Sequence, residues 1–247
     1  MSNYSFGKIK LKKREKELVK LIKKYILEER NIYPVKKILA PNNKQIKGLR
    51  PNYIFYTSKV FKNYVNELAS ILAIAAGMKN PILPNYGDLH SSFAVGWHRD
   101  SSGYKYDEPR HAHLFKEKKK CIKFYIRMTF SPLDLKILDE NNKVHRLISN
   151  NTQIAFFDVR NLHATYINNP LFKKSKVLSK ILDKIHNSLL IRIYNFFKGF
   201  ETIRGSNLYF FVYEDCETWR NYAKRELERA ESQIKKDKEA LDKFYSI

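Results

Sequence analysis

From residue 82 onward the sequence returns repeatedly to short runs of aromatic and β-branched residues, and this pattern most restricts the possible folds. Residues of these types favour strands, and turn residues or charged stretches separate one run from the next. No long helical pattern alternates with the runs, so we expect an antiparallel barrel or sandwich and not a parallel, doubly wound sheet. The runs occupy residues 89–98, 121–130, 152–167, 188–197 and 206–215.

Helical patterns precede and follow these runs. Residues 12–30 carry apolar side chains at helical spacing opposite lysines, and residues 58–77 form a wide apolar stripe with Ser58 as a cap and Gly77 as a stop. We therefore expect one domain over residues 1–247, made of a helical N-terminal part (1–80), a β core (82–213) with an insertion at 170–188, and a charged C-terminal helix (214–247).

The net charge of +22 over 247 residues predicts attraction to anions, although compositional drift toward lysine also produces such a value. Anionic partners that fit this charge are nucleic acid, an anionic membrane surface, an acidic carrier protein, and a phosphorylated or carboxylated small molecule. We find no apolar run near the ~18 residues that span a bilayer, and no secretory signal at the N-terminus. Two cysteines, Cys121 and Cys216, are too few for a disulfide framework, so we expect a cytoplasmic protein with reduced thiols.

A candidate metal site begins in the stretch GWHRDSSG, residues 96–103. His98 and Asp100 are two residues apart at the end of a predicted strand, so both side chains can reach one point. His163, in the later stretch IAFFDVRNLH, is the best candidate for a third ligand. Two imidazoles and one carboxylate suit non-haem Fe(II) and leave other coordination positions open. The alternative is that His98 and Asp100 form a polar pair at a strand end, and that His163 is an unrelated histidine of the core or of a loop.

The two stretches WHRDSS and IAFFDVRNLH resemble the metal motifs of the Fe(II)/2-oxoglutarate-dependent oxygenases, in particular the phytanoyl-CoA dioxygenase-like branch. The resemblance covers roughly residues 85–200. It implies an α+β protein with a mainly β core: a double-stranded β-helix of the jelly-roll, cupin-like type, with helices packed outside. It also implies Fe(II) and 2-oxoglutarate as cofactors, with His98, Asp100 and His163 as the metal ligands.

The resemblance further implies a cation that pairs with the far carboxylate of 2-oxoglutarate. In this family it usually comes from the strand after the distal histidine, and here the predicted strand 188–197 supplies Arg192. The family usually places this arginine closer behind the histidine, and the insertion at 170–188 would account for the longer gap. Arg127, in the run 121–130, is the alternative.

The stretch HAHLFKE gives a competing metal pattern, because His111, His113 and Glu117 have a spacing similar to the first cupin motif. The flanking glycines of that motif are missing and no second cupin motif follows. We expect instead a loop over the barrel mouth, from which Arg110, His111 and His113 touch the substrate. Trp97 is expected to form a wall of the site.

Taken with the resemblance, the site predicts a dioxygenase that releases succinate and CO2, with no catalytic residue beyond the metal centre. Related halogenating enzymes replace the metal-binding carboxylate by a small residue, so Asp100 favours hydroxylation, or a desaturation or demethylation. The expected substrate is small, and anionic or tethered to a carrier. Two alternatives remain: a nucleic-acid-modifying oxygenase that uses the basic N-terminal helix, and a cupin-like, non-catalytic metal-binding protein.

Overall fold

The computed structural model describes residues 4–28, 53–55, 59–83, 86–91, 95–100, 112–128, 133–167 and 206–245. The predicted insertion at 170–188 and the predicted strand at 188–197 lie outside these residues. None of the helices in the described part of the chain is long and apolar enough to cross a membrane.

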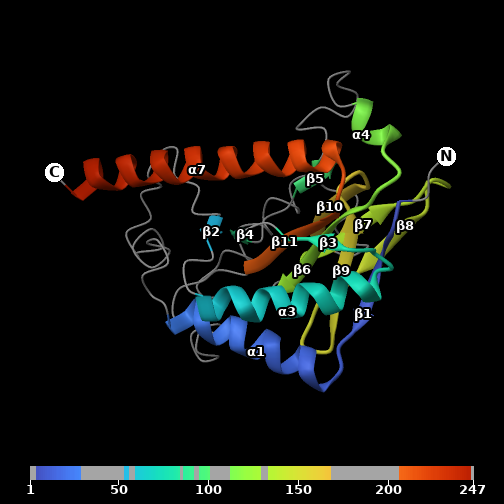
Figure 1. Ribbon diagram of the computed structural model, residues 1–247, viewed down its shortest axis with the longest axis horizontal. Helices are drawn as coiled ribbons and strands as arrows, with labels where there is room; N and C mark the ends of the chain where they lie inside the picture. Colours follow the sequence, from blue (N-terminus) through green and yellow to red (C-terminus); the bar gives the residue numbers. More distant parts are fainter. Residues whose placement is uncertain are drawn as a thin grey trace.

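Two antiparallel sheets form the centre of the described structure (Figure 1). The larger sheet has the order β1-β9-β6-β11-β4-β2, with β3 also paired to β11, and the smaller has the order β5-β10-β7-β8. The larger sheet comprises β1 (Phe6–Lys10), β2 (Tyr53–Phe55), β3 (Pro81–Ile82), β4 (Tyr86–Ser91), β6 (Cys121–Arg127), β9 (Gln153–Asp158) and β11 (Ser206–Glu214). The smaller comprises β5 (Val95–His98), β7 (Leu133–Leu138), β8 (Val144–Leu147) and β10 (Leu162–Ile167).

The helices lie outside the sheets, as the sequence predicts. They are α1 (Lys13–Glu28), α3 (Lys59–Ala75), the short α4 (Ala112–Lys116) and α7 (Glu217–Tyr245). In Figure 1, α1 and α3 lie side by side on one side of the strands and α7 lies on the other. Gly77, with φ of 72°, follows α3 as the expected stop, because this left-handed conformation is easiest for glycine. The predicted fold class, a mainly β core of two sheets with packed helices, is confirmed.

Successive side chains along the strands of the larger sheet point to opposite faces, and each face packs into its own hydrophobic core. On one face, apolar side chains such as Phe124, Ile126 and Phe210 pack against α1 and α3. On the other face, Tyr125 and Phe157 pack against the smaller sheet. The two sheets therefore face each other across a second apolar layer, to which the smaller sheet contributes Leu135, Ile137 and Leu147.

Five strands of the described structure were not expected from the sequence: β1, the short β2 and β3, and the pair β7 and β8. Residues 6–10, which fall in the predicted helical N-terminal part, form the edge strand β1, and Phe6 pairs with Phe157 of β9. β7 and β8 form a hairpin of the smaller sheet. The sequences of β7 and β8 carry charged residues on one face only. Such a short alternation of apolar and charged residues predicts a strand less strongly than the long aromatic runs do. The stretch that we expected to be a loop over the barrel mouth includes the helix α4.

Helix α3 provides a direct test of this layer arrangement. Leu72 is 0% exposed, whereas Ile74, two residues later in the same helix, is 69% exposed. We expect Leu72→Ala to lower the free energy of unfolding by about 2–5 kcal/mol, because it leaves a cavity against the larger sheet. Ile74→Ala should change it by less than about 0.5 kcal/mol. Urea denaturation measures both, and equal effects would contradict the layer assignment.

Candidate metal centre

Three side chains from the ends of two neighbouring strands converge at one point. His98, the last residue of β5, is paired with His163 of β10, and Asp100 follows two residues after His98. Oδ1 of Asp100 lies 3.9 Å from Nε2 of His98 and 3.7 Å from Nε2 of His163. Within the described residues, these three form the one group of histidine, cysteine and acidic side chains whose ligand atoms all lie within 4.8 Å of one another.

The donor set fits a divalent transition metal ion. Imidazole nitrogen and carboxylate oxygen bind such ions at about 2.0–2.2 Å, so adjacent ligand atoms in an octahedral site stand about 3 Å apart. The observed separations of 3.7 and 3.9 Å are wider by less than 1 Å, which small side-chain rotations can close. Two imidazoles and one carboxylate are also the ligand types of a facial triad.

A backbone contact fixes the tautomer of His163. Its Nδ1 lies 3.0 Å from the carbonyl oxygen of Asn161, and a carbonyl can only accept, so Nδ1 carries the proton and Nε2 presents its lone pair to the site. Burial lowers the pKa of His163 to about 4, and the neighbouring Asp100 only partly opposes this effect. The imidazole is therefore neutral near pH 7, as a metal ligand must be.

Lys123, from β6 of the larger sheet, contacts Asp100 on the side away from the two histidines. Its Nζ donates to Oδ2 of Asp100 at 3.1 Å, which leaves Oδ1 directed at the two imidazoles. Burial alone would raise the pKa of Asp100, but Lys123, His163 and His98 outweigh it and hold the pKa well below its usual range. The carboxylate is thus ionised and offers a single oxygen to the site.

The sequence analysis did not identify Lys123. The signal was present, because Lys123, Tyr125 and Arg127 alternate with the apolar residues of the run CIKFYIR, and alternate residues share one face of a strand. On that face Lys123 lies 4.7 Å from the ring centroid of Tyr209, and Arg127 donates to the hydroxyl of Tyr125 at 3.3 Å. The alternative cofactor residue Arg127 therefore shares the inner face of β6 with Lys123.

The other residues predicted for the site do not join the three metal ligands in the described structure. Trp97 is half-buried and precedes His98 in β5, so strand alternation directs the two side chains to opposite faces, and its role as a wall stays a prediction. His113 is exposed on α4. In the competing cupin-like set, the carboxylate of Glu117 accepts a hydrogen bond from the backbone of Lys119 at 2.8 Å. Arg110, His111 and Arg192 lie outside the described residues.

Comparisons with known proteins give no match to a protein-family model and none to a curated protein. Similar solved structures include AviO1 from Streptomyces viridochromogenes Tue57, at 12% identity and a TM-score of 0.45, over 87% of this chain and 91% of that one. They also include a Pseudomonas putida prolyl-4-hydroxylase, at 9% identity and a TM-score of 0.41, over 86% of this chain and 94% of that one.

A third similar structure is SnoK from nogalamycin biosynthesis, described as a non-heme alpha ketoglutarate dependent carbocyclase. The identity is 10% and the TM-score 0.42, over 85% of this chain and 79% of that one. Identities and TM-scores this low assign neither a reaction nor a substrate to the chain.

The lowered pKa of His163 predicts a pH dependence of the metal-free protein. Between about pH 6.5 and pH 4 the unfolded chain takes up a proton at this residue that the folded chain does not. The free energy of unfolding should therefore fall as the pH decreases through this window, by up to about 1.4 kcal/mol per pH unit from this group. Urea titrations at pH 7, 6 and 5 measure it. The His163→Gln variant should lack this part of the decline, and an identical pH dependence of both proteins would contradict the prediction.

Proposed function

We propose that this protein is a non-haem Fe(II)- and 2-oxoglutarate-dependent dioxygenase. The observation that carries the proposal is the convergence of two imidazole nitrogens and one carboxylate oxygen within 4.8 Å at the end of the smaller sheet. This ligand set is typical of Fe(II) oxygenases, because it holds the ion on one face and leaves positions for a chelating co-substrate and dioxygen.

His98, Asp100 and His163 would hold the ion. Fe(II) would supply the redox chemistry, in which dioxygen oxidises the substrate while 2-oxoglutarate loses CO2 and becomes succinate. The chain supplies ligand geometry: Asn161 orients the ring of His163, and Lys123 holds the outer oxygen of Asp100. The apolar layer between the sheets, which includes Phe157 beside the ring of His163, keeps water from this side of the site.

The co-substrate needs a cation for its far carboxylate, because a buried carboxylate without a partner is costly. Arg127 is supported by its place on the inner face of β6, where its guanidinium reaches back to Tyr125, two residues from Lys123. Arg192 remains the first candidate from the sequence pattern. Variants of the two arginines, described below, separate these assignments.

The proposed substrate is small, and anionic or attached to an acidic carrier. Support comes from the net charge of +22 and from the two cations, Lys123 and Arg127, on the inner face of β6. Asp100 retains a metal-binding carboxylate, which favours hydroxylation, or a desaturation or demethylation, over halogenation.

The alternative of a nucleic-acid-modifying oxygenase receives less support from the fold. Lys13, Lys16 and Lys20 are exposed on α1, and α1 packs on the outer face of the larger sheet. The metal ligands lie on the other side of that sheet, so phosphate contacts with α1 would not by themselves bring a base to the site. A non-catalytic metal-binding protein would keep the same triad, and turnover measurements distinguish it.

The metal assignment predicts that His98→Ala weakens Fe(II) binding by at least about 100-fold and abolishes succinate release, because one of three ligands is lost. Anaerobic Fe(II) titration and a succinate assay with 2-oxoglutarate measure the two effects. His145→Ala is the matched control, since His145 also pairs with a carboxylate, Asp139, at 2.6 Å in the smaller sheet. Equal binding and turnover in both variants would contradict the proposed function.

The co-substrate assignment predicts opposite results for two variants. If Arg127 binds 2-oxoglutarate, Arg127→Met should raise the KM for 2-oxoglutarate by at least about tenfold, which corresponds to about 1.4 kcal/mol, with little change in Fe(II) affinity. Arg192→Met should then leave this KM within about twofold. The reverse pattern would assign the cation to Arg192, and no effect from either variant would exclude both residues.

A further inference from the structure

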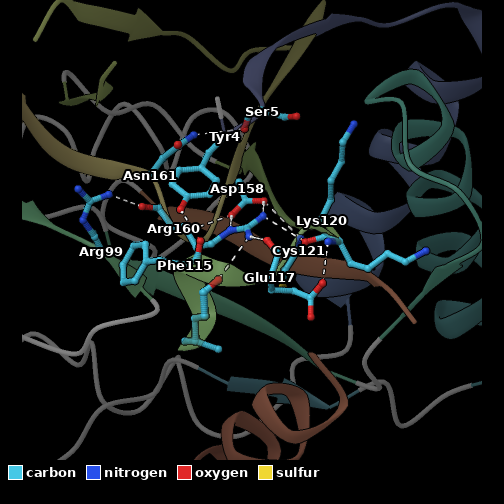
Figure 2. Close-up of polar contacts among 12 residues, drawn as sticks. Tyr4, Ser5, Arg99, Phe115, Glu117, Lys120, Cys121, Asp158, Arg160 and Asn161 are labelled. Atoms are coloured by element: carbon cyan, nitrogen blue, oxygen red, sulfur yellow. Dashed lines mark hydrogen bonds and ion pairs between the residues drawn. The ribbon is translucent and has the colours of Figure 1, made fainter. Parts of the chain in front are cut away.

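The chain passes from the larger to the smaller sheet in a three-residue corner, Val159–Asn161, between β9 and β10. Figure 2 shows that Arg160, in this corner, extends its side chain back to Asp158. Nε and Nη2 of Arg160 donate to the two carboxylate oxygens at 2.7 Å each. Both side chains are buried, with exposed fractions of 3% and 0%. The ion pair therefore closes the corner with a bidentate contact that excludes water.

The remaining donors of Arg160 bind a second segment of chain. The guanidinium donates to the carbonyl oxygens of Leu114 at 3.4 Å, of Lys119 at 3.1 Å, and of Glu117. Its charge also lies between two aromatic rings, 4.4 Å from the centroid of Tyr4 and 5.1 Å from that of Trp219. The corner is thus fixed to the segment before β6, to the N-terminal strand region and to α7.

The backbone of the same corner contacts both parts of the metal site. Arg99 stands between the ligands His98 and Asp100, and its Nη1 donates to the carbonyl oxygen of Arg160 (Figure 2). The next carbonyl along the chain, that of Asn161, accepts from Nδ1 of His163. Two consecutive carbonyl groups therefore hold the segment that carries His98 and Asp100 and the ring of His163.

The pairing of β5 with β10 does not by itself fix the position of the metal ligands. β5 and β10 pair at His98 with His163 and at Val95 with Thr165, and the register shifts between these two positions. An irregular ladder specifies the spacing of its side chains less strongly than a regular one. A fixed point beyond the end of β5 is therefore needed to hold Asp100 opposite His163.

From these contacts we propose that Arg99 and Arg160 are positioning residues that together set the spacing of the metal ligands. We call the pair, with Asp158, the arginine clasp. Arg160 holds the corner in place through Asp158, and Arg99 ties the end of β5 to that corner. The clasp acts on the ligands through the backbone carbonyls of Arg160 and Asn161. It rests on the proposed function only for the purpose of the ligand spacing.

Arg99 is the residue to test, because it is half-buried and lies at the edge of the ion-pair network, so its loss should leave the fold intact. We expect Arg99→Ala to weaken Co(II) binding by about tenfold or more and to alter the visible absorption of bound Co(II), which reports ligand geometry. The thermal midpoint of the metal-free protein should stay close to that of the unmodified chain. Arg99→Lys, which can still donate to the carbonyl of Arg160, should restore part of the affinity.

Arg220→Ala is the matched control, since Arg220 donates at 2.9 and 3.1 Å to Asp215, an exposed pair near the start of α7. It should leave Co(II) affinity and absorption unchanged. A crystal structure of metal-free Arg99→Ala provides a readout that needs no metal: we expect a wider separation between Asp100 Oδ1 and His163 Nε2 than the present 3.7 Å.

The outcomes separate the clasp from the proposed function. If the unmodified chain binds no Co(II), the proposed function fails, and the crystal comparison alone decides on the clasp. If Arg99→Ala keeps both the ligand separation and any Co(II) affinity of the unmodified chain, the clasp is overturned. A wider separation with weaker Co(II) binding, partly restored in Arg99→Lys, supports it.

Discussion

The buried ion pair between Asp158 and Arg160 joins the corner beside the candidate metal centre to the segment before β6, to Tyr4 and to α7. Removing two charges from water costs several kcal/mol per ion, and only full hydrogen bonding of both groups offsets this cost. Here the carboxylate accepts from the guanidinium and also from the backbone N–H groups of Arg160, at 3.0 Å, and Cys121, at 3.4 Å. Satisfied in this way, the pair fixes the corner at which the chain passes from β9 of the larger sheet to β10 of the smaller.

The candidate metal centre depends on both sheets. Its three ligands come from the end of the smaller sheet, but Lys123 reaches Asp100 from the larger one. A change in the separation of the sheets would therefore alter how the carboxylate is presented, even if the triad itself kept its pairing. This explains why the apolar layer of Tyr125, Phe157 and Leu135 matters for the site as well as for stability.

Much of this arrangement could be predicted from the sequence, and the remainder could not for physical reasons. The aromatic runs contain β5, β6, β9, β10 and β11, but the runs 89–98 and 152–167 each divide between the two sheets. The two-residue spacing predicted that His98 and Asp100 reach one point, and His163, the best candidate for a third ligand, lies beside them. Alternation showed that Lys123 shares a face with Arg127, but it cannot show which residue lies across from that face. The sequence pattern assigned no role to Arg160, because its partners in the segment 114–120 are set by tertiary packing alone.

The order of strands in the larger sheet has a consequence for how the chain folds. β11, the last strand in the described sequence, lies in the middle of the sheet between β6 and β4. Helices α1 and α3 are synthesised long before β11, yet the surface that buries their apolar sides includes Leu208, Phe210 and Val212 of β11. These contacts join residues nearly the whole chain apart, a topology that slows folding. During synthesis, the first helical layer therefore waits for residue 214 before its core can close.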